Sequence, residues 1–102
     1  MVGEERVSGD VFTWSFDRVH LSVSREGDSW SVIYRTESPL LGPQQVIYEA
    51  RHRLPTHAAW EVLARVSRVT HDDEEGVRVA QQAARWMRAT MWPAEGQPSQ
   101  VC

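Results

Sequence analysis

The sequence predicts an α+β fold in which a three-stranded antiparallel sheet is followed by two helices packed on one face, in the order β-β-β-α-α. The main observation is a change of hydrophobic period at Pro55. Apolar residues recur at every second position before it and at every third or fourth position after it, which is typical of strands and then of amphipathic helices. A length of 102 residues, with 41% hydrophobic and 25% charged residues, fits one folded domain.

Residues 1–10 and 93–102 are expected to lie outside the folded domain. The first segment is polar and holds two glycines, which is typical of a flexible N-terminal arm. The last segment begins with a helix-ending proline and is expected to be a disordered C-terminal tail. The single α+β domain is therefore predicted to span residues 11–92.

The first predicted strand region runs from Val11 to Ser24, and its alternation slips by one position at Asp17 and Arg18. A β-bulge in one bent strand would return all of its apolar residues to a common face, and a tight two-residue turn is the alternative. Because Asp-Arg lacks the Gly or Asn that such turns prefer, we favour the bulge. The apolar residues are even-numbered before the slip and odd-numbered after it: Phe12, Trp14, Phe16, Val19, Leu21 and Val23.

Two further strands complete the predicted sheet. The second follows the turn signal Glu26–Ser29 and is centred on Val32. Segment 37–45 contains two prolines, so we expect it to form a linker that does not extend the sheet. The third strand is predicted within residues 46–54.

Two amphipathic helices follow the sheet. Pro55 bars backward extension of the first helix, and Thr56 is its predicted N-cap. The second helix begins after the acidic run Asp72–Glu75, whose first and last residues stand at capping-box spacing, and it ends before Pro93.

Five tryptophans are many for a chain of this length. Trp14 and Trp30 lie on the inward face of their strands and are predicted to belong to the core. Trp60 and Trp86 lie at the edges of the helical apolar arcs, and Trp92 follows on the polar arc. Tryptophan beside arginine is typical of protein interfaces, so these three residues are candidate partner-binding residues.

All eleven basic residues are arginines, a bias that fits a G+C-rich genome. Guanidinium groups bind carboxylates and phosphates in a bidentate manner, so those on the helices are a candidate binding stripe. A solvated face supplied with arginine by codon bias is the alternative, and the net charge of −3 disfavours nucleic acid as the partner. Five arginines lie on the predicted polar sides of the helices: Arg65, Arg68, Arg78, Arg85 and Arg88.

No run of residues has the order and spacing that catalysis, metal binding or nucleotide binding requires. His20 has Ser22 and Ser24 nearby in the chain, but outward alternation on a strand accounts for both serines. The acidic run 72–75 is explained by helix capping and by compensation of the helix dipole. We therefore predict no catalytic residue, no metal site, no cofactor and no enzymatic activity.

The hypothesis from the sequence is a small protein-interaction or regulatory accessory module, of the adaptor or inhibitor type and of the kind that phages and mobile elements encode. It would bind a protein partner, or a second copy as a homodimer, through the helical tryptophans and arginines. The alternative is a nucleic-acid-associated accessory protein that uses the same arginine stripe. No segment is long and apolar enough for a membrane span and no secretory signal precedes the domain, so the expected location is the cytoplasm.

Overall fold

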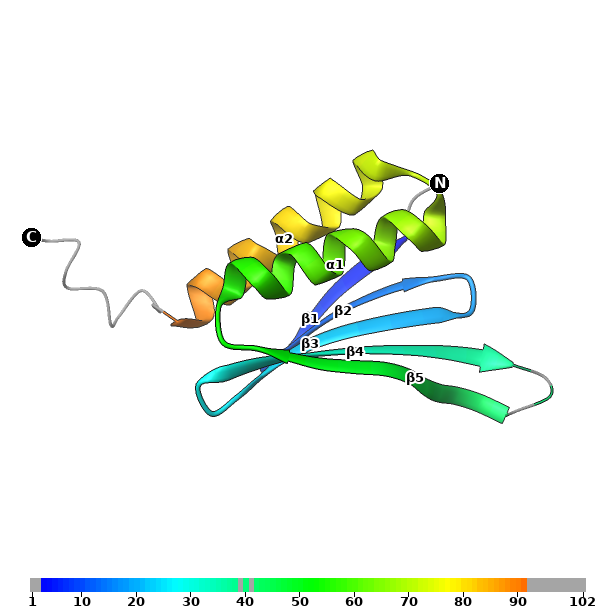
Figure 1. Ribbon diagram of the computed structural model, residues 1–102, viewed down its shortest axis with the longest axis horizontal. Helices are drawn as coiled ribbons and strands as arrows, with labels where there is room; N and C mark the ends of the chain where they lie inside the picture. Colours follow the sequence, from blue (N-terminus) through cyan, green and yellow to red (C-terminus); the bar gives the residue numbers. More distant parts are fainter. Residues whose placement is uncertain (1–2, 39, 41, 92–102) are drawn as a thin grey trace, which may run out of the picture.

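A computed structural model describes residues 3–38, 40 and 42–91, and it contains a five-stranded antiparallel sheet followed by two helices on one of its faces (Figure 1). The strands follow one another in space in the order of the chain. Their bounds are β1 Glu4–Ser8, β2 Val11–Phe16, β3 Val19–Glu26, β4 Ser29–Ser38 and β5 Gly42–His52, and the helices are α1 Pro55–Thr70 and α2 Asp73–Met91.

The predicted α+β class agrees with this structure, but the predicted count of three strands is wrong. One added strand, β1, comes from the segment that we expected to be a flexible arm. The other arises because the segment 11–24 is two strands, β2 and β3, and not one bent strand.

The β2–β3 connection is a two-residue turn at Asp17 and Arg18, so the predicted bulge is wrong. Phe16 pairs directly with Val19, and the register continues without interruption along both strands. In a hairpin with a two-residue loop, an even-numbered residue of one strand always pairs with an odd-numbered residue of the other. The change from even-numbered to odd-numbered apolar residues therefore leaves all of them on the same face of the sheet. Asp17 takes the left-handed conformation with φ 56°, which Asp tolerates better than most residues do.

The two other short hairpins have the same design. Gly9 opens the β1–β2 loop with φ 60° and Gly27 opens the β3–β4 loop with φ 63°. Among the β1–β2, β2–β3 and β3–β4 loops, the β2–β3 loop alone has a residue other than glycine, Asp17, at the position with positive φ.

The linker predicted over residues 37–45 is also wrong, because β4 reaches Ser38 and β5 starts at Gly42. The β4–β5 ladder has register shifts between Tyr34 and Arg35 and between Thr36 and Ser38. Pro43 lies in β5, which is the edge strand of the sheet. An edge strand needs partners on one side only, and this is the position in a sheet that accepts proline.

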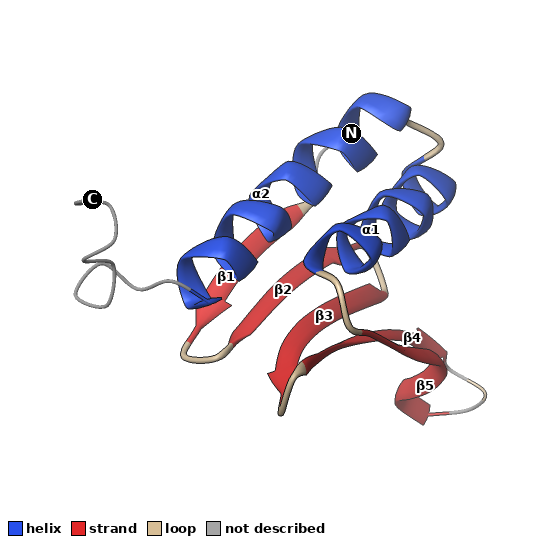
Figure 2. Ribbon diagram, turned by 60° about the vertical axis from the view of Figure 1, so that its left-hand side comes forward, coloured by secondary structure: helices blue, strands red, loops and turns tan. Residues whose placement is uncertain are grey.

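The core lies between the sheet and the two helices (Figure 2). Both tryptophans predicted for it, Trp14 and Trp30, are buried, which confirms that part of the prediction. The buried hydrophobic residues are Phe12, Trp14, Leu21, Val23, Trp30, Val32, Ala58, Val62, Val66, Val79, Ala80, Ala83 and Met87.

The two helix starts differ in how their backbone N–H groups are satisfied. For α1 the predicted N-cap is wrong, because Leu54 is the N-cap, its side chain makes no capping bond, and Pro55 is the first helical residue. Proline suits that position since it lacks an N–H group that would go unpaired. For α2 the Oδ1 atom of Asp72 accepts the N–H groups of Glu74 at 3.0 Å and Glu75 at 3.3 Å, as the acidic run predicts.

No helix within the described residues is long and apolar enough to cross a membrane.

The carboxylate of Glu75 is buried and joins α2 to the start of the sheet. Its Oε2 accepts the backbone N–H of Gly3 at 2.9 Å and the indole N–H of Trp14 at 3.4 Å, while Arg78 donates to both carboxylate oxygens at 2.9 and 2.6 Å. Arg78 also donates to Glu5 on β1. Gly3 is required here because an added Cβ would lie 2.3 Å from the Trp14 Nε1 atom. These bonds explain why the polar N-terminal segment is a strand.

Hydrogen bonds from Arg78 lower the pKa of Glu75 below its ordinary value, against the opposing effect of burial. The hydrogen bonds that Arg78 donates to Glu75 raise the pKa of Arg78 above its ordinary value. Because the fold favours the ionised carboxylate, Glu75 stabilises the protein above its unfolded-state pKa. That contribution is lost as the pH falls through the folded-state pKa.

We expect Asp17→Val to lower the free energy of unfolding by about 1 to 2 kcal/mol, because a β-branched residue disfavours the left-handed conformation. Urea denaturation measures the effect. Arg18→Val is the matched control, since Arg18 is exposed in the same loop and does not have a positive φ. Equal losses from the two substitutions would contradict this explanation of the turn.

We expect Glu75→Gln to lower the free energy of unfolding by about 2 kcal/mol at neutral pH, because Arg78 loses its charged partner. The difference from the native chain should shrink as the pH falls below the ordinary pKa of a glutamate, and it should vanish once the pH has fallen through the lowered pKa of Glu75 in the folded chain. Denaturation at a series of pH values measures both effects. Glu74→Gln removes a neighbouring exposed carboxylate from the same helical turn, and a similar loss from that variant would show that helix-dipole compensation is the cause.

Candidate functional site

A shallow apolar groove runs between the two helices on the side that faces away from the sheet. Small residues at the helix contact leave it open, and the indole of Trp60 forms part of its wall. Thr56, Ala59, Trp60 and Leu63 of α1 line the groove together with Val77, Ala80, Gln81, Ala84 and Arg88 of α2.

Trp60 is exposed because of its position on α1. Ala58 and Val62 are fully buried against the sheet, and Trp60 lies two residues from each, about 200° around the helix. Its exposed fraction is 63%, and that of Val77 across the groove is 41%. Large apolar side chains are thus presented to solvent on a surface that the fold itself does not need.

The two ends of the groove carry opposite charge. The helices are antiparallel, so the start of α1 at Thr56 lies beside the end of α2 at Arg88 (Figure 1). At the other end, Asp73 and Glu74 are exposed in the first turn of α2, close to Val77. The groove therefore runs from a basic end to an acidic end.

The structure places Arg65 away from the groove, on the sheet side of α1. Its guanidinium lies 3.8 Å from the ring centre of Tyr48 and 5.6 Å from that of Tyr34, and it donates to Glu61 at 3.0 Å. Burial works against its charged form, but the hydrogen bonds that it donates to Glu61 and Tyr48 raise the pKa of Arg65 above its usual value. Arg65 therefore clamps β4 and β5 to α1.

Trp86 and Arg78 are likewise engaged within the fold. The Trp86 ring packs on Phe12 at 6.0 Å between ring centres and edge-on to Trp30 at 5.7 Å. Arg78 is paired with Glu75 and Glu5.

Of the eight residues predicted to bind a partner, the structure brings Trp60 and Arg88 together in one groove. Arg68 and Arg85 are exposed elsewhere on the helices, and Trp92 lies outside the described residues. Sequence periodicity does not distinguish the apolar groove residues from the core residues of the helices, because it does not separate the two sides of a wide apolar arc. The sequence of α2 gave no signal for the groove, because Val77 and Ala84 fall at the centre of the apolar arc that the pattern predicts for this helix.

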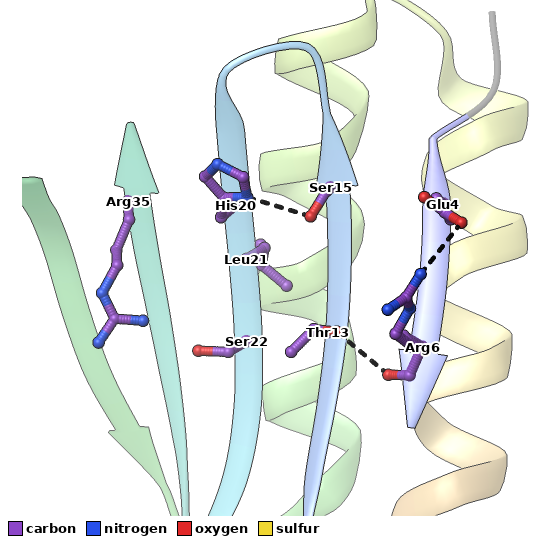
Figure 3. A pocket seen from close by; sticks show the side chains of 8 residues that line it. All are labelled: Glu4, Arg6, Thr13, Ser15, His20, Leu21, Ser22 and Arg35. Carbon is purple, nitrogen blue, oxygen red and sulfur yellow. Dashed lines mark hydrogen bonds and ion pairs between the residues drawn. The ribbon is translucent and has the colours of Figure 1, made fainter. Parts of the chain in front are cut away.

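A second, polar site lies on the opposite side of the molecule, on the sheet face that the helices leave open (Figure 3). Ser15, His20 and Arg35 occupy directly opposed positions on β2, β3 and β4. The Oγ of Ser15 lies 3.1 Å from Nδ1 of His20, and Nε2 of His20 lies 2.7 Å from Oε2 of Glu37. The hollow around them is lined by Glu4, Arg6, Thr13, Ser15, His20, Leu21, Ser22 and Arg35.

Comparison with known proteins found no matching family model, no matching curated protein and no matching solved structure.

Proposed function

We propose that this protein is a small interaction module that binds a protein surface through the groove between α1 and α2, with Trp60 as the central anchor. The supporting observation is the 63% exposure of Trp60 beside an apolar groove. Tryptophan is enriched among the residues that contribute most to protein binding, and burying its ring removes a large apolar area from water.

The occupant that best matches the groove is the same groove of a second copy. A two-fold axis perpendicular to the groove exchanges its ends, so it sets the Arg88 end of one copy over the Asp73 and Glu74 end of the other. Each copy then supplies a basic and an acidic end to its partner, as a self-complementary interface requires.

The size of the surface indicates a dimer of modest affinity. With 16 residues, α1 is about 24 Å long, and two adjacent helices present a face about 20 Å wide. This footprint is near or below the roughly 800 Å² per partner of a standard interface. We therefore expect dissociation in the micromolar range.

The structure gives less support to the arginine stripe as a nucleic-acid surface. Arg65 and Arg78 are paired with carboxylates, and both contribute to the packing of the fold. A steep loss of association with duplex DNA or RNA as salt rises would favour that alternative. For the groove, the apolar lining predicts only a shallow salt dependence.

We expect Trp60→Ala to raise the dimer dissociation constant by at least about 30-fold, the effect of losing an interface anchor. Sedimentation velocity over a concentration series measures it, and circular dichroism should remain native because Trp60 is not in the core. Leu54→Ala is the matched control, since Leu54 is 54% exposed but lies outside the groove. A native chain that stays monomeric at the highest concentrations would overturn the proposal.

The end charges allow a separate test. We expect Arg88→Glu to weaken the dimer, because it places carboxylates of both copies together, and the added Glu74→Arg substitution to restore it. The same sedimentation series measures both variants. If the doubly substituted chain is folded but dissociates like the single variant, the two-fold arrangement is wrong.

A further inference from the structure

The polar site on the open sheet face contains a chain of three hydrogen-bonded side chains. Ser15 and His20 are directly opposed across β2 and β3, and Glu37 projects from β4 beside His20 (Figure 3 shows Ser15 and His20 meeting over the strands). Helices α1 and α2 lie behind the sheet in this view, and the partly exposed side chains of Ser15 and His20 lie on its other face.

The contact with Glu37 fixes the tautomer of the neutral His20 ring, and the tautomer sets the direction of its other hydrogen bond. A carboxylate only accepts hydrogen bonds, so the contact of Glu37 with Nε2 places a proton on that nitrogen. In a neutral imidazole the other nitrogen, Nδ1, is then an acceptor, and it receives the hydroxyl proton of Ser15. The Ser15 hydroxyl is therefore already bonded to a base, and that base is held by a carboxylate.

We propose that Ser15 is a nucleophile that His20 activates, and that it reacts with small activated carboxylic esters in the hollow beside it. A hydroxyl, a base within hydrogen-bond reach and a third group that orients the base are the three elements that nucleophilic catalysis by serine requires. His20 and Glu37 keep 27% and 41% of their side-chain surface exposed, so the group is reachable from solvent.

The reaction is balanced with water as the co-reactant. Ser15 Oγ forms a bond to the ester carbonyl carbon while its proton passes to Nδ1 of His20, and Glu37 stabilises the imidazolium. The carbon–oxygen bond to the alcohol then breaks, and the alcohol leaves with the proton from His20. Water next attacks the acyl group on Ser15 with His20 again taking the proton, which releases the acid and restores Ser15.

The surroundings of Ser15 indicate a slow reaction. Strand β2 is paired with β1 on one side and with β3 on the other, so its backbone N–H groups are committed to the ladders. Those groups are not aimed at a developing oxyanion, and removing even one such donor from an enzyme costs about 10²- to 10³-fold in rate. We therefore expect acylation of Ser15 followed by low turnover.

The test is incubation of the full chain with p-nitrophenyl acetate, followed by release of p-nitrophenolate and by peptide mass spectrometry. The expected result is an acetyl group on Ser15. Ser15→Ala and His20→Ala should each lower the release rate by about 10²-fold, the lower range for general-base catalysis. Ser24→Ala is the matched control, because Ser24 lies on the same strand as His20 but does not line the hollow and is not bonded to His20.

The sequence makes the label easy to assign. The chain has no lysine and one cysteine, so the competing nucleophiles are chiefly Cys102, the other histidines and the N-terminus. Repeating the assay with Cys102→Ser removes the thiol background. An acetyl group found only on such residues, or an undiminished rate in folded Ser15→Ala, would overturn the proposal.

Glu37 is a positioning residue, and its role has a separate readout. Glu37→Gln keeps the side-chain shape but loses the charge that stabilises the imidazolium, so kcat should fall while KM stays unchanged. A change in KM alone would show that Glu37 shapes the hollow and does not act through His20.

Discussion

The two-residue turn between β2 and β3 is the constraint on which the rest of the structure depends. It pairs Phe16 with Val19, and this one pairing directs both Trp14 and Leu21 toward the helices. The same register places Ser15 directly opposite His20 on the outer face. A shift of one residue would turn every side chain of β3 over, so the core and the polar site on the open face both require the left-handed conformation of Asp17.

The buried carboxylate of Glu75 has a comparable role at the other end of the fold. The sequence analysis explained the acidic run by helix capping, and Asp72 does cap α2. Glu75, however, is 4% exposed and turns its carboxylate toward Trp14 and Gly3. A buried carboxylate has to be fully paired, and two of its three partners, Gly3 and Trp14, lie about 70 and 60 residues away in the chain. Such long-range pairing leaves no periodic signal, which is why β1 was expected to be a flexible arm.

Local periodicity was sufficient to predict the fold class, the two helices and the burial of Trp14 and Trp30, because each depends on near neighbours in the chain. It was insufficient for the sheet topology, because a bulge and a two-residue turn at Asp17 and Arg18 produce the same change from even-numbered to odd-numbered apolar residues. The error also hid the polar site. His20 was compared with Ser22 and Ser24, its neighbours in sequence, whereas its hydrogen-bond partners are Ser15 and Glu37 on the adjacent strands. For the interaction surface, helical position put Trp60 at the edge of its apolar arc, whereas the structure places it about 200° around α1 from the buried Ala58 and Val62. The pairing of Arg65 with Tyr48 also required the tertiary structure.

The two proposed sites lie on opposite sides of the core, which determines how they relate to each other. The groove faces away from the sheet, and the polar site lies on the sheet face that the helices leave open. A layer of fully buried side chains, including Trp14, Leu21 and Val62, separates them. Pairing of two copies through their helices would therefore leave both copies of Ser15 open to solvent, on the two outer surfaces of the dimer. Substitutions that are far apart and share no partner act independently, so the proposed association and the proposed serine reactivity are expected to respond to separate substitutions.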